Sequence, residues 1–396
     1  MKLLWVNSSF LHPTNRGGQI RTLEMLRQLH RHHEVHYAAL SDPREPEGPA
    51  RAGEYSARSF PIPFQPVSKR SLAFALELAA GLFSPLPLAI GRWRSPELRA
   101  TVQRLLHEER YDAVVCDFLV TAVNCPELEK AVLFQHNVET MIWKRHADTA
   151  RGLRRQFFRI QERRMRAFEA GAVHKTAQVI AVSEQDVATM REMFGVEAAA
   201  VPTGVDTEYF RPPEDVAPSG LVFVGSMDWL PNIDGIQWFS KEVLPLIRAH
   251  RKDLPVTIVG RLPPPEIERL AVDDPFLKVT GTVPDVRSYL WGAAVSIVPL
   301  RIGGGTRLKI YEAMAAGTPL VSTTIGAEGL DVVDGETIAL ADSAADFARR
   351  CLELVSDDAA RSRMRTQAMD MVRARYSWEQ VTQQFEKLLH PVAAAQ

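Results

Sequence analysis

Short apolar runs alternate with amphipathic stretches along the first half of the chain. Between the first two runs, Ile20, Leu23 and Leu26 recur at helical spacing and predict a helix over residues 18–33. The apolar runs have the length of buried strands and lie at residues 2–6, 35–40, 113–116, 131–134 and 179–182. Strands that alternate with helices predict a parallel sheet with both faces covered.

The same pattern starts again near residue 221. A helix is predicted over residues 233–250, and the proline-rich segment 202–219 is typical of an interdomain linker. The pattern therefore predicts two doubly wound α/β domains with a ligand cleft between them, over residues 1–203 and 204–375. The strands predicted in the second half lie at residues 221–224, 256–259, 278–280, 295–298, 320–323 and 337–340.

Three segments of the first domain do not follow the alternation. Residues 41–68 hold six prolines and many charges, which predicts a long surface excursion. Residues 71–90 are apolar over a length that could span a membrane, but Glu77 and two prolines interrupt them, so a buried or membrane-touching helix pair is favoured. Residues 144–166 hold nine Lys and Arg and predict the solvated face of one long helix.

The charge balance, the cysteine count and the motif spacing exclude some classes of function and of site. The 47 Lys and Arg balance 48 Asp and Glu, so no overall positive field is available to hold nucleic acid. Three cysteines form no C-x-x-C pair, which favours a reducing, cytoplasmic location and no zinc site. The apolar start of the chain is too short for a signal peptide. The segment from His33 to His36 is one residue short of H-E-x-x-H, so a metal site is not expected there.

The strongest chemical signal is the segment VPLRIGGGTRLKIYEAMAAG at residues 298–317. A strand ends at Val298, three glycines follow (Gly303, Gly304 and Gly305), and a helix begins near Thr306 or Arg307. Glycines allow close backbone approach, and a helix start with Arg307 and Lys309 favours an anion such as a diphosphate. No G-K-[ST] follows, so this is not a P-loop. A flexible turn with two solvated cations is the alternative.

This segment, read on to residue 330 as GGGTRLKIYEAMAAGTPLVSTTIGAEGL, resembles the donor-binding region of GT-B glycosyltransferases, and specifically of the retaining family 4. VPTGVDTEYF at 201–210, GLVFVGSMDWLPNIDGIQWF at 220–239 and NRGG at 15–18 resemble further segments of that family. Residues 376–396 resemble its final helix, which crosses back to the first domain. The resemblance implies a GT-B fold and transfer with retention, by a front-face route without a covalent intermediate.

The resemblance also assigns roles in the second domain. Arg307 and Lys309 would hold the diphosphate, and Glu312 would accept the ribose hydroxyls; an exposed helix glutamate is the alternative for Glu312. The backbone of Gly225 and of residues 303–306 would face the donor, and Val283 would meet the nucleotide base.

Two departures from the family pattern bear on the diphosphate. The first of two frequent family glutamates is replaced by Gly304, and the loop 226–232 lacks the usual Arg and Lys. By resemblance, that Arg and Lys would clamp the diphosphate, and Arg307 and Lys309 are inferred to take over this role. Loss of the diphosphate clamp by degeneration would leave the same sequence pattern. The chain also contains no Asp-x-Asp pair, so metal-independent transfer without a cofactor is expected.

In the first domain, the polar cluster FQHNVE follows the strand that ends near Phe134. By resemblance, His136 would touch the donor sugar; a histidine satisfied inside the protein is the alternative. Glu139 is expected to start the next helix rather than to act as a nucleophile. Gly17 and Gly18 would let the backbone approach the diphosphate, and Arg16 is a weaker candidate.

The sequence therefore predicts a hexosyltransferase that moves a sugar from a nucleotide-diphosphate donor to a saccharide or lipid-linked acceptor in polysaccharide assembly. It would act in the cytoplasm, with peripheral contact at the inner face of the membrane. A nucleotide-sugar 2-epimerase and a non-catalytic sugar-nucleotide-binding scaffold remain alternatives. A dinucleotide oxidoreductase is disfavoured because no G-x-G-x-x-G follows either opening strand.

Overall fold

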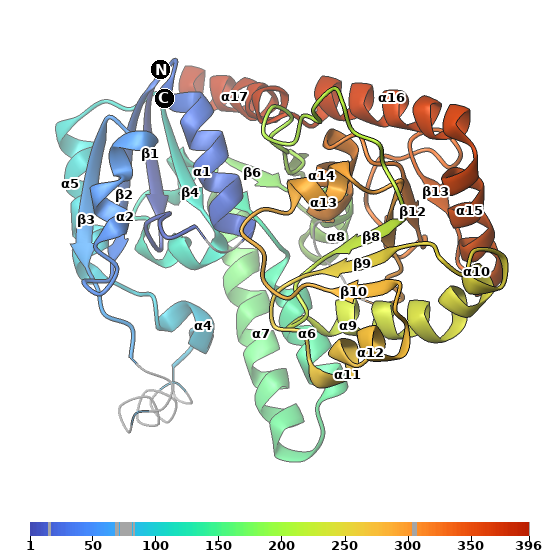
Figure 1. Ribbon diagram of the computed structural model, residues 1–396. Helices are drawn as coiled ribbons and strands as arrows, with labels where there is room; N and C mark the ends of the chain where they lie inside the picture. The colour runs from blue at the N-terminus through green and yellow to red at the C-terminus, as the bar shows by residue number, and fades with distance from the viewer. Residues whose placement is uncertain (15–16, 68–70, 72–80, 82–83, 303–306, 396) are drawn as a thin grey trace. The chain divides into compact units, whose positions relative to one another are not determined.

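The computed structural model describes residues 1–14, 17–67, 71, 81, 84–302 and 307–395. The chain forms two compact units (Figure 1). Unit 1 comprises Met1–Pro202 with Val381–Gln396, and unit 2 comprises Thr203–Gln380. Each unit contains its own parallel sheet, which confirms the predicted class of two doubly wound α/β domains.

Unit 1 is built on a seven-stranded sheet in the order β3-β2-β1-β4-β5-β6-β7. All its strand pairs are parallel. The strands are β1 (Lys2–Asn7), β2 (Glu34–Ser41), β3 (Arg58–Pro63), β4 (Ala113–Asp117), β5 (Ala131–Gln135), β6 (Gln178–Ala181) and β7 (Ala199–Ala200). The helices are α1 (Gly17–His30), α2 (Glu47–Ala50), α4 (Leu88–Gly91), α5 (Pro96–Glu108), α6 (Glu139–Thr149), α7 (Gly152–Lys175), α8 (Glu184–Phe194) and the greater part of α17 (Trp378–Ala395).

Both faces of this sheet are buried. Leu4 and Val6 of β1 belong to a core that also holds apolar side chains of α5, α7 and α8. Trp5 points to the other face because side chains alternate along a strand. Its ring lies 5.6 Å from that of Phe385 on α17, so the C-terminal helix covers part of that face.

The expectation that residues 41–68 form only a surface excursion is wrong, because β3 lies within them. Two of its six residues are proline, which cannot donate to a ladder and is therefore confined to edge strands. Among the described residues, β3 pairs only with β2 and is the edge strand. The two-residue β7 was also not predicted.

Unit 2 is built on a six-stranded parallel sheet in the order β10-β9-β8-β11-β12-β13. Its core includes Phe223, Phe239, Ile258, Ile297 and Phe347. The strands are β8 (Leu221–Val224), β9 (Val256–Val259), β10 (Leu277–Val279), β11 (Val295–Val298), β12 (Leu320–Ser322) and β13 (Ala339–Leu340). The helices are α9 (Leu230–Trp238), α10 (Leu244–His250), α11 (Pro265–Glu268), α12 (Leu270–Asp273), α13 (Arg287–Trp291), α14 (Leu308–Ala315), α15 (Ala344–Ser356) and α16 (Asp358–Arg375).

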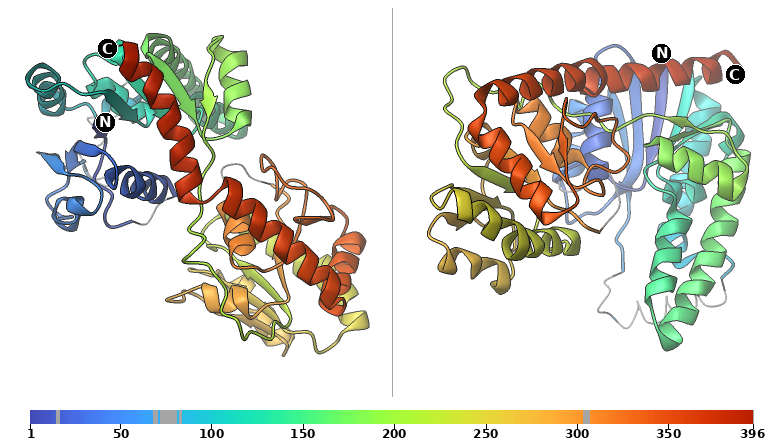
Figure 2. Two further views of the ribbon diagram at one scale, coloured as in Figure 1. Left: turned by 90° about the horizontal axis from the view of Figure 1, so that it is seen from above. Right: turned by 90° about the vertical axis from the view of Figure 1, so that its right-hand side faces the viewer.

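Two predicted helices are not single regular α-helices. The basic stretch 144–166 is not one helix, because α6 ends at Thr149 and α7 begins at Gly152, a glycine with a φ of 59°. The two helices lie side by side as a hairpin that extends away from the sheet of unit 1 (Figures 1 and 2). In unit 2, a π-helical turn at Phe239–Val243 separates α9 from α10.

None of the helices among the described residues is both long and apolar enough to cross a membrane. Most of the apolar stretch 71–90 lies outside the described residues, so its predicted helix pair is not described here. All three cysteines are buried and none forms a disulfide.

Candidate active site

The strand order of each sheet reverses at one point, and loops diverge there at the carboxyl ends of the strands. In unit 2 the reversal lies between β8 and β11, and in unit 1 it lies between β1 and β4. Open parallel sheets bind ligands at such switch points. Gly225 follows β8, and Gly18 lies at the start of the helix after β1. Gly225 and Gly18 therefore lie where the topology favours a ligand.

The loop after β8 is packed closely against the loop after β9. Val224 and Val259 are paired in parallel register at the ends of these strands, and each is followed by a glycine. A Cβ added to Gly260 would lie 1.8 Å from the carbonyl oxygen of Gly225. Only glycine fits so close a backbone approach, so these two loops leave the sheet together.

Lys309 on α14 reaches this loop. Its Nζ donates a hydrogen bond of 2.7 Å to Oδ1 of Asn232, whose Nδ2 donates one of 2.6 Å to the carbonyl of Ser226. The ammonium also lies 4.7 Å from the ring centre of Phe223. We call Asn232, Arg307, Lys309 and Glu312 the α14 cluster. Asn232 was not predicted as a site residue.

Arg307 precedes α14 directly and is 3% exposed. Its Nη2 donates to the carbonyl of Ile325 at 3.3 Å, and its guanidinium lies 6.0 Å from the ring centre of Trp229. The predicted site residues Gly303, Gly304, Gly305 and Thr306 lie outside the described residues, as does Arg16. The helix begins at Leu308, so Arg307 occupies its N-cap position.

Burial shifts the pKa values of this cluster towards neutrality. Desolvation, with repulsion from Arg307, lowers the pKa of Lys309 to about 7. Desolvation also raises the pKa of Glu312 to about 7, against the attraction of Lys309. Since both charged forms are disfavoured by burial, an anion brought against Lys309 would restore the positive charge there. Shifts of this kind concentrate at functional sites.

Val283 lies on the loop after β10, near Gly281 with its φ of 68°. Its side chain packs against the hydrophobic core that includes Val259 and Tyr311. The structure therefore places this segment at the same edge of the sheet, since all the strands of unit 2 are parallel.

In unit 1, His136 is 6% exposed and both of its ring nitrogens are engaged. Arg21 Nη1 lies 3.1 Å from Nδ1, and Nε2 lies 2.7 Å from Asp117 Oδ1. A guanidinium can only donate, so Nδ1 accepts and Nε2 carries the proton. The ring stacks on Phe118, with centroids 3.7 Å apart. Desolvation lowers the pKa of His136, which favours this neutral form.

Asp117, at the end of β4, is the centre of this arrangement and is fully buried. Its Oδ1 accepts from His136, and its Oδ2 accepts three further hydrogen bonds. Desolvation lowers the pKa of Arg21 to about 10, against the attraction of Asp117. The Asp117 network, as we name it, consists of Trp5, Asn7, Arg21, Thr22, Asp117 and His136. Asp117 was not predicted as a site residue. The signal that could have found it is its position directly after the predicted buried strand at residues 113–116.

Gly17 and Gly18 are the first residues of α1. Gly17 is exposed, with open space where a Cβ would lie. A Cβ on Gly18 would lie 2.6 Å from the ring of Phe118 and 3.6 Å from Nδ1 of His136. The structure thus brings Gly18 and His136 together, and a side chain at position 18 would displace the ring of Phe118.

Glu139 starts α6, as predicted. Glu169 on α7 accepts hydrogen bonds from the backbone amides of Glu139 and Thr140, at 3.0 and 2.8 Å, and so caps that helix. Burial and the Glu169 charge raise the pKa of Glu139 to about 7.

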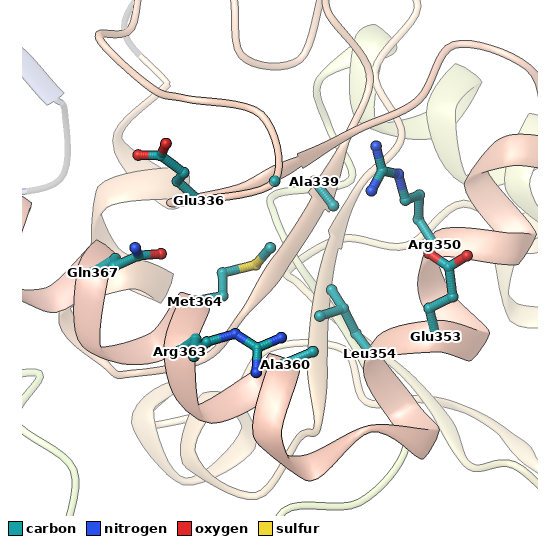
Figure 3. A pocket seen from close by; sticks show the side chains of 10 residues that line it. Glu336, Ala339, Arg350, Glu353, Leu354, Ala360, Arg363, Met364 and Gln367 are labelled. Atoms are coloured by element: carbon teal, nitrogen blue, oxygen red, sulfur yellow. The ribbon is translucent and has the colours of Figure 1, made fainter.

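Among the described residues, no group of three His, Cys, Asp or Glu side chains is arranged to hold a metal ion. A cavity of about 220 Å³ lies in unit 2, away from the switch point (Figure 3). Its lining comes from Gly335 and Glu336, from β13, and from α15 and α16. It contains none of the predicted site residues.

Several solved structures share this fold over nearly the whole chain. Sucrose-phosphate synthase from Thermosynechococcus elongatus matches with a TM-score of 0.68 and 17% identity, covering 100% of both chains. HepE from Anabaena, in complex with UDP and glucose, matches with a TM-score of 0.64 and 14% identity over 98% of this chain and 99% of that one. WaaG, a glycosyltransferase involved in lipopolysaccharide biosynthesis, gives 0.61 and 16%, with the same coverage. At these identities the likeness shows the GT-B fold.

Two curated relatives match in sequence. A phosphatidyl-myo-inositol mannosyltransferase of Mycolicibacterium smegmatis is 29% identical over 54% of this chain and 58% of its own length. A protein in the cps region of Klebsiella pneumoniae is 24% identical over 42% and 45%. The chain spans about half the length of the curated relatives it matches.

Two family models match successive parts of the chain. The model for Glycosyltransferase Family 4 matches residues 15–209, and the model for Glycosyl transferases group 1 matches residues 218–357. Together they extend over most of both units, and they agree with the family identified from the sequence motifs. The chain therefore has the GT-B fold and belongs to the group 1, family 4 glycosyltransferases.

Proposed function

We propose that this glycosyltransferase moves a hexose from a nucleotide-diphosphate sugar to a saccharide, including a lipid-linked saccharide, with retention and without a metal ion. The observation that carries the proposal is the α14 cluster at the switch point of unit 2. It places Arg307 and Lys309 at a helix start, where a leaving diphosphate needs positive charge positioned in advance. The absence of an Asp-x-Asp pair supports the metal-free route.

The remaining roles follow the family resemblance. Glu312 would accept the ribose hydroxyls, Val283 would meet the base, and the backbone of Gly225 and of residues 303–306 would approach the donor. His136 would contact the donor sugar from unit 1, with Gly17 and Gly18 near the diphosphate. Because the Asp117 network holds the ring of His136 in one orientation and one tautomer, such a contact would be preorganised.

The relatives suggest which substrates to test first. HepE is described in complex with UDP and glucose, so UDP-sugars are the first donors. The mycobacterial relative is named for a lipid acceptor, and the Klebsiella relative lies in a cps region. We propose polysaccharide assembly in the cytoplasm, at the inner face of the membrane, as the setting.

Transfer is tested with labelled UDP-, GDP- and ADP-sugars, each with a panel of saccharide and lipid-linked acceptors and with EDTA present. We expect one donor to give a product whose anomeric configuration, measured by NMR, matches that of the donor. Inversion would contradict retention, and loss of transfer in EDTA would contradict metal independence. Conversion of the donor alone would indicate the 2-epimerase, and donor binding without transfer to any acceptor would indicate the scaffold.

The α6–α7 hairpin is the surface that we propose for membrane contact. Exposed on α7 are two apolar side chains, Leu153 (83%) and Ile160 (45%), next to a basic face. Each Lys or Arg near an anionic bilayer contributes about 1 kcal/mol. That face is formed by Arg154, Arg155, Arg159, Arg163 and Arg166.

Reversing three of these charges, as Arg154→Glu, Arg155→Glu and Arg159→Glu, is expected to weaken sedimentation with phosphatidylglycerol-containing vesicles by more than about 100-fold, since loss of the three positive charges alone accounts for that factor. Vesicles of phosphatidylcholine alone should bind neither protein. The matched control reverses Arg363, Arg373 and Arg375 on α16 and should sediment like the wild type. Equal loss in both triple variants would show that overall charge, and not this hairpin, is responsible.

A further inference from the structure

The loop between β8 and α9, residues 225–229, contains no Lys or Arg and carries Asp228. Arg261 comes from the neighbouring loop, after β9, and its side chain lies across this position. Its Nε donates a hydrogen bond of 2.8 Å to Oγ of Ser226, and its Nη2 lies 3.2 Å from Oδ2 of Asp228. A cation is therefore present at this loop although the loop's own sequence contains none.

The backbone holds Arg261 in this place. Strands β8 and β9 are in register up to Val224 and Val259, and the close contact of Gly225 with Gly260 keeps the two loops together. The amide of Met227 donates to the carbonyl of Arg261 at 2.9 Å. The base of the Arg261 side chain is thus fixed relative to the loop, while the side chain itself remains 54% exposed to solvent.

Arg261 and Lys309 lie at the two ends of one chain of contacts. Lys309 bonds to Asn232, and Asn232 bonds to the backbone of Ser226. The side chain of Ser226 then accepts from Arg261 and donates to Asp228 at 2.6 Å. The two cations therefore approach the loop after β8 from opposite sides, one from α14 and one from β9.

We infer that Arg261 is a further donor-binding residue, which contacts the diphosphate opposite Lys309 and leaves Asp228 when the nucleotide binds. This inference rests on the proposed function, because it assigns a residue to the same donor site. A guanidinium forms forked, charge-assisted hydrogen bonds with phosphate oxygens. Its present partner is an exposed carboxylate, and exposed ion pairs contribute little, so the exchange costs little. Asp228 acts as a competitor that neutralises Arg261 in the free protein.

The inference makes two opposite predictions for the two members of the ion pair. Loss of a charge-assisted hydrogen bond in Arg261→Met should raise the Kd for nucleotide about 10- to 100-fold. Removing the competitor in Asp228→Asn should lower the Kd about two- to fivefold. If the pair served only to hold the loop, both variants would weaken binding in the same direction.

The experiment titrates UDP, GDP and ADP into the full-length protein by calorimetry and uses the one that binds most tightly. Arg251→Met is the matched control, since Arg251 forms an exposed ion pair with Asp253 in the same unit. It should bind like the wild type. Thermal unfolding is measured for every variant, and Asp228→Asn keeps the test decisive if Arg261→Met folds poorly.

Unchanged binding in Arg261→Met, or weaker binding in Asp228→Asn, would overturn the inference while leaving the proposed function intact. Failure of the wild type to bind any of the three nucleotides would overturn both. Opposite shifts in the two variants, with the control unchanged, would support Arg261 as a donor contact.

Discussion

Lys309→Met is expected to lower kcat for sugar transfer about 100- to 1,000-fold, because it removes a positioned charge that a departing diphosphate requires. Methionine retains much of the packing against Phe223. The substitution leaves Asn232 without the hydrogen bond from Nζ, but Asn232 keeps its bond to Ser226. Folding should therefore survive, and the loss should fall mainly on catalysis. Initial rates with the donor identified in the transfer assay measure it.

The protonation of Lys309 provides a second test of the same role. Because its pKa is about 7 in the free protein, Lys309 is mostly neutral at pH 8. A bound diphosphate favours the ammonium, so nucleotide binding should take up a proton and should weaken as the pH rises from 7 to 9. Calorimetry in two buffers with different ionisation enthalpies measures this uptake. Glu312 is mostly ionised at pH 8 and contributes little there.

The control for Lys309→Met is Lys252→Met, at an exposed lysine in the same unit. That variant should keep both the wild-type rate and the proton uptake. If Lys309→Met transferred sugar at the wild-type rate, or took up the same proton as the wild type, Lys309 would not be the partner of the diphosphate. In that case the family role assigned to this helix start would be wrong for this chain.

The fold class was predictable because the strand positions repeat regularly in both halves, and buried parallel strands are short continuous apolar runs. The exceptions have physical causes. Strand β3 contains two prolines, and only its position at the sheet edge makes that acceptable. The break between α6 and α7 spans two residues within a basic stretch whose composition does not change across it.

The candidate site was predictable in position but not in its contacts. Lys309 was predicted from its place after the glycines, whereas its partner Asn232 is 77 residues away in the chain. Asp117 stands at the end of a predicted strand, but its partners come from β1, α1 and the segment after β5, and only the fold brings them together. Arg261 joins the loop after β8 because β8 and β9 are neighbours in register.

Asp117→Asn is expected to destabilise unit 1 by about 3–5 kcal/mol. This is the cost of leaving the buried guanidinium of Arg21 without the carboxylate charge that attracts it. The carboxylate accepts hydrogen bonds on both oxygens, from His136 on one and from Trp5 and others on the other. An amide can accept on one side only, so when its oxygen keeps the three donors on the Oδ2 side, its NH₂ group faces the Nε2 proton of His136. The imidazole cannot switch tautomer to relieve this, because Arg21 donates to Nδ1.

Hydrogen–deuterium exchange measured on peptides from the strands of each unit tests this expectation, since exchange reports the free energy of local opening. Peptides of β1, β4 and β5 should lose protection in Asp117→Asn, while peptides of β8 and β11 should not. Asp148→Asn, at an exposed aspartate of α6, should leave both sets unchanged. The double variant Asp117→Asn, Arg21→Met should lose less free energy of unfolding than the sum of the two single variants. Each single change leaves one buried charge without its partner, whereas the double change removes both charges. Strict additivity would show that Arg21 and Asp117 are not coupled, and the orientation of His136 would then have to come from its stacking on Phe118.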